Sequence, residues 1–429
     1  MLREERVNCA TVIFFFSKSL PISREHIAMA TPDLEAYQVL EQRKHALKRP
    51  ESYIGSVVAE TVRTPVVAGG QLTITDVEGV VPGLLKLFDE VLVNASDNKQ
   101  RDPAGMTQLA VDFVCEGPDA GGIKIRNNGE GLPVAEHPKE KVWIPVLVFG
   151  TLLSGSNFDD DQKKTVGGRN GFGAKLANIF STRFRLRTGD GTHQLAVEWT
   201  DHMLTQGPVR VTKGKSQFTE VTFWPDYAFF QVPGLPSGVK QLMERRVYDV
   251  AGCTPSSLTV RLDGTKLPST FAAYCSMLPG TLLLDKCPRW EVAVLPAADK
   301  EVGHLSFVNG IHTRTGGTHV THVTDQLCKV LADQLKAKHK LELRKGLLRE
   351  GLLVVVNALV ENPTFEGQCK HQLTTKTKDF GSRYTPSAPF LAKLKKGGSI
   401  DVSYWENVAA QVSGVVSRFK FSIIDYILH

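Results

Sequence analysis

The sequence has no apolar run long enough for a membrane-spanning helix; the longest run near the start covers only residues 11–16. Cysteine is sparse: seven residues are scattered along the chain, with no C-x-x-C pair and no zinc-ligand spacing. No internal repeat and no low-complexity tract is present. These absences argue against a membrane span, a zinc module and a repeat array, and they favour isolated thiols in a reducing compartment.

Charge is also nearly balanced, with a formal net charge of +6. Such an excess permits contact with nucleic acid but does not argue for it, because the distribution of charge decides. The length of 429 residues predicts two or more domains. Residues 1–29 differ from the rest and are interpreted as an N-terminal extension, either a weak targeting segment or, as we favour, a disordered stretch before Met29.

Hydrophobic periodicity predicts a mixed α+β chain. Helical patterns cover residues 37–48, 80–97 and 142–153, and an alternating strand at 122–126 ends in the turn "NNGEG". The alternation over residues 184–223 predicts an antiparallel meander. A second unit follows, with strands in "RWEVAVL", "HLSFVNG" and "LLVVVNALV" and a helix over residues 320–340, so we place a boundary close to residue 267.

The stretch "GGRNGFGAKLAN", residues 167–178, is rich in glycine and leads into helix-forming residues. It fails the Walker A pattern because Ala174 separates the last glycine from Lys175 and Leu176 follows the lysine. It also fails the dinucleotide fingerprint, which needs a glycine where Leu176 stands. Glycines still let a backbone approach phosphates closely, and the amides of a helix that begins near Gly173 favour negative charge. A tight turn without a ligand remains an equal alternative on this stretch alone.

Glu90 and Asn94 lie four residues apart in "FDEVLVNASDNKQR" and therefore share a helix face, which Asp97, Asn98 and Arg101 continue. The polar side of an amphipathic helix is the common explanation. Here apolar residues surround the pair, which favours a pocket lined by the two side chains. A glutamate there can activate a water molecule, and an asparagine oxygen can hold Mg²⁺.

Asn127 ends the strand before the turn "NNGEG". An amide can recognise the exocyclic amine of adenine by hydrogen bonding, although an ordinary Asn-Gly hairpin turn would look the same. The order of the motifs favours the nucleotide. A Glu-x-x-x-Asn helix, an N-x-G-x-G turn, a glycine-rich lid and a threonine on a strand, Thr219, form the Bergerat arrangement of the GHKL ATPases.

Within that class, long stretches resemble the ATPase region of the eukaryotic type IIA DNA topoisomerases over roughly residues 35–415. The stretches that carry the resemblance include "RPESYIGSV", "FDEVLVNASDNKQRDP", "NNGEGLPV", "SFVNGIHTRTGGTHV" and "VNALVENPTFEGQCK". The resemblance implies a GHKL α/β sandwich over residues 30–267, a ribosomal-protein-like α/β transducer domain over 268–415, and the start of a linker to a cleavage core over 416–429.

The resemblance also implies the cofactors ATP and Mg²⁺ and a role for each matched residue. Glu90 corresponds to the general base, Asn94 to the Mg²⁺ ligand, and Lys370 to the lysine that reaches the γ-phosphate. Tyr37 corresponds to an arm residue that reaches the nucleotide of a partner protomer. The remaining residues implied to bind ATP are Asn127, Ser156, Asn157, Gly168, Arg169, Asn170, Gly171, Phe172, Gly173, Ala174, Lys175, Thr219, Gln368 and Cys369.

The implied partners are duplex DNA, a second copy of the chain and the cleavage core of the same enzyme, with no membrane. Lys336, Lys338 and Lys340 are expected to contact the DNA backbone, and a solvated helix face is the alternative. The nucleus is the expected location, and a mitochondrion or another DNA-containing organelle is the alternative. The chain ends before any cleavage module, so we expect it to hydrolyse ATP and clamp DNA without cutting it. Whether it is a fragment or a natural short form stays open.

Two positions depart from the family pattern: Gly155 replaces a serine of the ribose-contacting stretch, and Cys369 replaces a threonine beside the lysine. Two alternatives to the main interpretation stay open. One is another GHKL ATPase, chaperone-like or MutL-like, against which the Q-x-K loop and its "ENPTF" lead-in argue. The other is a module that binds ATP and dimerises without turnover, against which Glu90 argues.

Overall fold

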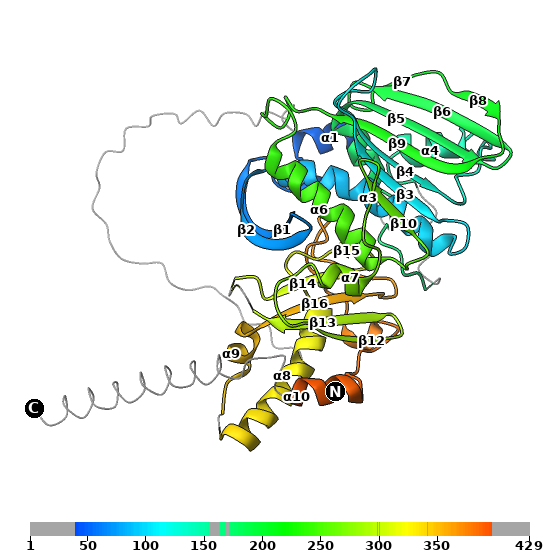
Figure 1. Cartoon of the computed structure of the whole chain (residues 1–429). Coiled ribbons are helices and arrows are strands. Elements are labelled where there is room, and N and C mark those ends of the chain that lie inside the picture. Colours follow the sequence, from blue (N-terminus) through cyan, green and yellow to red (C-terminus); the bar gives the residue numbers. More distant parts are fainter. Residues whose placement is uncertain are drawn as a thin grey trace, which may run out of the picture. The chain divides into compact units, whose positions relative to one another are not determined.

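The computed structural model describes residues 39–154, 163–168, 171–297, 299, 301–340 and 342–396. All elements below belong to one compact unit that begins at Glu41. Within the described residues, nine strands form one sheet and five form another, and a separate hairpin joins β1 (Glu60–Ala68) to β2 (Gln71–Val80) (Figure 1).

The strands of the larger sheet are nearly all antiparallel; the pair of β10 with β3 is parallel. Across the sheet the order is β11 (Thr265–Lys266), β10 (Thr259–Leu262), β3 (Gln108–Phe113), β4 (Ile123–Asn128), β9 (Gln217–Pro225), β5 (Ser181–Asp190), β6 (His193–Thr200) and β7 (Thr205–Gln206), and β8 (Arg210–Lys213) also pairs with β6. The helices of this part are α1 (Gln42–Lys48), α2 (Glu51–Ile54), α3 (Pro82–Arg101), α4 (Ile144–Gly150), α5 (Gly173–Ile179) and α6 (Ser237–Cys253).

The predicted meander is wrong in one pairing. β5 and β6 form a hairpin and β8 pairs with β6, as expected, but β9 does not pair with β8. Instead, β9 inserts between β5 and β4. Burial explains the difference: all of β8 is exposed, which suits an edge, whereas Val221 and Phe223 of β9 are buried and belong in the centre of the sheet.

Helix α3 is the buried centre of the first part. Pro82 begins the helix, where a missing amide hydrogen costs nothing, and the expected apolar face is buried through Leu84, Leu87, Phe88 and Val91. These side chains join one core with Ile123 and Ile125 of β4 and with α5 and α6. Because α3 is covered on most sides, its polar side chains must face either a cavity or a buried partner.

The smaller sheet has the order β12 (Leu283–Cys287), β13 (Trp290–Pro296), β16 (Leu352–Ala358), β14 (His304–Val308) and β15 (Ile311–His312). The other elements of this part are α7 (Phe271–Cys275), α8 (Thr318–His339), α9 (Lys345–Glu350), a short 3-10 helix at Thr377–Asp379 and α10 (Ala388–Lys396). The predicted boundary near residue 267 falls between the strands of the two sheets and stays a prediction.

Burial on both faces accounts for the continuous apolar run of β16. Val354 and Val356 face a core formed with α8, α9 and α10, while Leu353 and Val355 face a second core that includes α7. β14 and β16 run parallel, which α8 makes possible as the crossover between them (Figure 1). Leu72 of β2 also packs into the second core, so the hairpin connects to this sheet.

Candidate active site

Two cavities lie along α3. The first has a volume of about 490 Å³ and the second about 80 Å³, and Glu90 and Lys370 line both of them. The first cavity gathers many of the residues predicted from the sequence to bind a nucleotide. These are Glu90, Asn94, Asn127, Gly168, Gly171, Gly173, Ala174, Lys175, Thr219, Gln368 and Lys370.

Glu90 is a buried carboxylate held between two lysines. Its side chain is 3% exposed and forms ion pairs with Lys86, one helical turn earlier, and with Lys370, whose Nζ lies 3.6 Å from Oε1. Burial on its own would raise the pKa of Glu90, but Lys370 and Lys86 outweigh burial and lower that pKa to about 2. The carboxylate is therefore charged at neutral pH.

Three of the four polar side chains that continue the face of Glu90 on α3 line the first cavity, and the fourth is hydrogen-bonded to a buried backbone segment. Asn94, Asn98 and Arg101 line the cavity, as their shared helix face predicts. Asp97 instead accepts hydrogen bonds from the glycine-rich segment: the amide of Gly167 lies 3.0 Å from each carboxylate oxygen, and the amide of Gly168 lies 2.9 Å from Oδ2. Sequence reasoning placed Asp97 on this face but gave it no role.

Asn127 and Thr219 face each other because β4 and β9 pair in antiparallel register. Asn127 is buried and its amide donates to the carbonyl of Asn128 at 3.0 Å. Thr219 lies 3.3 Å from the hydroxyl of Thr188 on β5. The sheet thus places one amide and one hydroxyl on the wall of the cavity, where they can recognise the polar edge of a base.

The glycine-rich segment lies directly against the polar side chains of α3. A Cβ at Gly173 would lie 2.6 Å from Oε2 of Glu90, and one at Gly168 would lie 3.0 Å from Oδ1 of Asn94. A larger residue at position 173 would therefore force the Glu90 carboxylate to shift. Phe172 points elsewhere and packs edge-on against Tyr53, with ring centroids 5.9 Å apart.

Lys175 is buried at the start of α5 and donates to the carbonyl of Ser154 at 2.5 Å. Burial lowers the pKa of Lys175 to about 8. The contact joins the helix to the residues that follow α4, and the side chain still lines the first cavity. Lys175 therefore has a structural partner as well as access to a ligand.

The three residues of the Q-x-K loop divide between the cavities. Gln368 lines the first cavity, Cys369 lines the second, and Lys370 lines both. Lys370 is buried and has a left-handed backbone (φ 61°), which is uncommon for a residue other than glycine and costs on the order of 1 kcal/mol. Its Nζ also donates to the carbonyl of Gly167 at 3.3 Å. This lysine thus links Glu90 with the glycine-rich segment.

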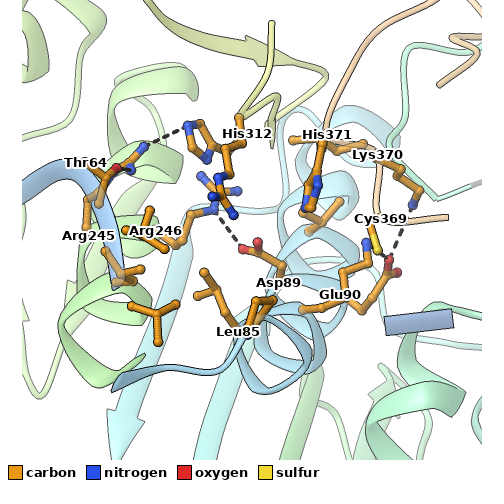
Figure 2. Close-up of a pocket in the computed structure, with 18 residues that line it drawn as sticks. Thr64, Leu85, Asp89, Glu90, Arg245, Arg246, His312, Cys369, Lys370 and His371 are labelled. Carbon is orange, nitrogen blue, oxygen red and sulfur yellow. Dashed lines mark hydrogen bonds and ion pairs between the residues drawn. The ribbon is translucent and has the colours of Figure 1, made fainter. Parts of the chain in front are cut away.

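Figure 2 shows the second cavity, where Asp89, next to Glu90 on α3, points toward Arg246. Nε of Arg246 donates to Asp89 at 2.7 Å and its Nη1 donates to Asp249 at 2.7 Å, while Nη2 donates to the carbonyl of Gly310 at 3.3 Å. The hydroxyl of Tyr274 donates to Asp249 at 2.6 Å. This buried network joins α3 and α6 to the smaller sheet, and no sequence motif signals it.

Several predicted residues lie outside the described part of the chain: Tyr37, Ser156, Asn157, Arg169 and Asn170. Of the three lysines expected to contact DNA, Lys336 is exposed on α8 and pairs with Glu342 at 2.6 Å. Lys340 is exposed just past the end of α8. The side chain of Lys338 is outside the described atoms.

Two family models match the chain in turn. The model for histidine kinase-, DNA gyrase B- and HSP90-like ATPases matches residues 79–228, and the model for DNA gyrase B matches residues 273–396. The first match covers α3 and the strands that line the larger cavity. Fold and site together define an ATPase of the GHKL class.

The relatives and solved structures narrow this class. DNA topoisomerase 2 of Penicillium chrysogenum is 40% identical over 391 residues, which is 84% of this chain and 24% of that protein. The crystal structure of the ATPase region of Saccharomyces cerevisiae topoisomerase II is 38% identical with a TM-score of 0.81, covering 88% of this chain and 99% of that one. The ATPase and transducer domains of DNA topoisomerase II from Balamuthia mandrillaris are 36% identical with a TM-score of 0.82, covering 89% of this chain and 100% of that one.

The chain belongs to the type II DNA topoisomerase family and corresponds to its ATPase region. It spans about a quarter of the length of the curated Penicillium relative. No helix in the part of the chain that the structure describes has both the length and the apolar character needed to cross a bilayer.

Proposed function

We propose that the chain binds ATP in the first cavity and hydrolyses it, and that ATP binding closes two copies into a clamp around duplex DNA. One observation carries the proposal: a charged, buried glutamate, the amide side chain of Asn94 on the same helix and a lysine from the loop after β16 line one cavity of about 490 Å³, and the lysine and the glutamate form an ion pair. Glycines form another wall of the same cavity. Phosphoryl transfer depends mostly on positioning and charge stabilisation, which such a set supplies.

Glu90 is the group suited to act as general base. It keeps its charge at neutral pH and it lies against the start of α5, beside Gly173. A positioned carboxylate can orient a water molecule and accept its proton as the water attacks the γ-phosphate. Lys370 already lies 3.6 Å from this carboxylate, so its ammonium group can stabilise charge on the same phosphate.

The residues present fit a magnesium ion that arrives with the nucleotide. No group of three or more His, Cys, Asp or Glu side chains gathers among the described residues in a way that could hold a metal by itself. Asn94 contributes an amide oxygen to the first cavity, beside Gly168. Mg²⁺ prefers oxygen ligands and usually takes most of them from phosphates and water, so a single protein ligand is sufficient. When bound, the ion would neutralise phosphate charge.

We extend the proposal to the whole enzyme from the family membership. Two protomers would meet through their nucleotide sites, with Tyr37 reaching across, and trap a DNA segment for strand passage. Lys336, Lys338 and Lys340 would contact the DNA backbone, and the cleavage core of a complete topoisomerase would cut and reseal the other duplex. The nucleus is the proposed location, because the relatives include eukaryotic DNA topoisomerases 2.

Two measurements test this proposal. ATP turnover of the purified chain with Mg²⁺ should be measurable and should rise when duplex DNA is added. Size analysis should show a monomer that becomes a dimer with a non-hydrolysable ATP analogue and Mg²⁺. A chain that dimerises without turnover is instead an ATP-dependent dimerisation module, and a chain that stays monomeric with saturating analogue does not form the proposed clamp.

A further inference from the structure

Residues 164–168, which lead into and begin the glycine-rich segment, are held from two opposite sides. Their carbonyl groups are bonded by residues from the second part of the chain: the backbone amide of Asn362 donates to Lys164 at 3.0 Å, Nδ2 of Asn309 to Val166 at 3.3 Å, and Nζ of Lys370 to Gly167 at 3.3 Å. The amides at Gly167 and Gly168 point the other way, toward α3. A single side chain, Asp97, accepts the hydrogen bonds of both.

We propose that Asp97 is a positioning residue for ATP binding: its carboxylate anchors Gly167 and Gly168 to α3, so that their backbone stands beside Asn94 where the phosphates bind. The inference rests on the proposed nucleotide site in the first cavity. Both oxygens of Asp97 are used, and the residue lies two helical turns after Glu90, on the same helix face. One rigid helix thereby sets the positions of the general base, the magnesium ligand and the glycine pair.

Burying the charged carboxylate of Asp97 costs folding stability, which fits a residue whose role is functional. The side chain is buried, and burial raises its pKa to about 6, against the lowering effect of the Gly167 and Gly168 amides. An acid whose pKa is higher in the folded state destabilises the fold at pH values above that pKa, where it must stay charged. In return, the amides of Gly167 and Gly168 have a charged acceptor that a neutral side chain would not supply.

Asp97→Asn is the sharpest test, because it keeps the shape of the side chain. The Asn amide group would place N–H hydrogens against a glycine N–H, so one of the two oxygens no longer accepts. We expect the affinity for adenylyl imidodiphosphate with Mg²⁺, measured by calorimetry, to fall about tenfold, as the loss of one charge-assisted hydrogen bond predicts. The melting temperature at pH 7.5 should not fall, because a buried charge is removed at the same time.

Asp226→Asn is the matched control. Asp226 also accepts backbone amides, those of Ala228 at 3.1 Å and Phe229 at 3.3 Å, but it lines neither cavity. This variant should bind the analogue like the wild type. The inference is overturned if Asp97→Asn binds the analogue with wild-type affinity, or if its affinity and its melting temperature fall together while Asp226→Asn keeps both. Absence of ATP turnover in the wild type, with analogue binding intact, would refute the proposed hydrolysis and leave this inference standing.

Discussion

Glu90 is a carboxylate that its buried position would neutralise and that two lysines keep charged. The two lysines come from different places. Lys86 precedes Glu90 by one turn of the same helix and lines only the second cavity, whereas Lys370 belongs to a distant loop and lines both. On the proposed function, Lys86 would therefore stay paired with Glu90 while Lys370 contacts the phosphate.

Lys86→Met should move the acidic limb of the pH profile of ATP turnover to higher pH. With Lys86 removed, burial of Glu90 is opposed by Lys370 alone, so the pKa of Glu90 rises from about 2 and the base becomes protonated at a pH where the wild type is still charged. The measurement is kcat from pH 9 down to the lowest pH at which both proteins keep their native circular dichroism. Lys240→Met, which removes a partly exposed lysine with the same i, i+4 spacing to Glu244, is the control. Identical profiles for Lys86→Met and the wild type would contradict this account of Glu90.

At the scale of elements, helix α3 has two roles: one face lines the first cavity and the neighbouring face is bonded to α6. Its cavity face carries Glu90 and Asn94, and its neighbouring face carries Asp89, which is bonded to Arg246 of α6. Arg246 in turn donates to Gly310, in the turn between β14 and β15. Helix α3 is thus fixed to the smaller sheet by a charged network, and a change on one side must be accommodated by the other.

Arg246→Met should be strongly destabilising. The substitution leaves Asp249 buried without one of its cationic partners, a situation that costs about 3–5 kcal/mol in other buried ion pairs. Thermal unfolding followed by circular dichroism checks this. Lys286→Met removes an exposed partner of Glu291 and should leave the melting temperature unchanged. Equal melting temperatures for Arg246→Met and the wild type would show that the network does not hold the two parts together.

His319 on α8 predicts a second stability effect, which depends on pH. The ring is fully buried, Nε2 lies 3.2 Å from the hydroxyl of Thr313, and burial lowers the pKa of His319 to about 3. A histidine with a lower pKa in the folded state stabilises the fold above its unfolded pKa of about 6.5, and this stability is lost as the pH falls toward 3.

His319→Asn should therefore lose stability less steeply than the wild type below pH 6.5, by up to about 1.4 kcal/mol per pH unit. The free energy of unfolding from urea titrations at several pH values gives this slope. His193→Asn, at an exposed position, serves as control. Parallel slopes for His319→Asn and the wild type would mean that His319 is not the group that takes up the proton.

At the scale of the whole molecule, the contact between Lys370 and Glu90 connects α3 to the loop after β16 at the first cavity. ATP bound there would touch residues from both parts of the chain. On the proposed function, ATP binding and hydrolysis would then change how the second part is held, as a DNA clamp driven by ATP requires. The exposed end of α8, with Lys336 and Lys340, belongs to that second part.

Alanine at Lys336, Lys338 and Lys340 together should reduce the stimulation of ATP turnover by duplex DNA and leave turnover without DNA unchanged. The contacts proposed are to phosphates, so the remaining stimulation should also depend less on salt. Turnover at several salt concentrations, with and without DNA, measures both effects. A matched loss of basal and stimulated turnover would point to a role of these lysines in folding instead.

The sequence predicts well what is local. The i, i+4 spacing places Glu90 and Asn94 on one face of α3, and alternation identifies β4 and its end at the Asn-Gly turn. Long-range pairing is different. Whether β9 lies beside β8 or between β4 and β5 depends on which strand buries more apolar surface, and that is decided only when the sheet assembles.

Two features of the site are likewise beyond local reasoning. Lys370 follows Glu90 by 280 residues, so no local sequence pattern predicts their contact. Only the family resemblance pointed to it. Asp97 has the spacing of a cavity residue, yet its oxygens are taken by Gly167 and Gly168. The spacing of residues along a helix predicts the direction in which a side chain points but not the group that it contacts.

The most direct test of the central claim compares Glu90→Gln with the wild type in both binding and chemistry. Gln keeps the shape of the side chain and removes the base, so the variant should bind ATP with Mg²⁺ at near wild-type affinity while its turnover falls at least about a hundredfold. Wild-type turnover in Glu90→Gln, or no turnover in the wild-type chain itself, would contradict the assignment of Glu90 as the catalytic base of an ATPase.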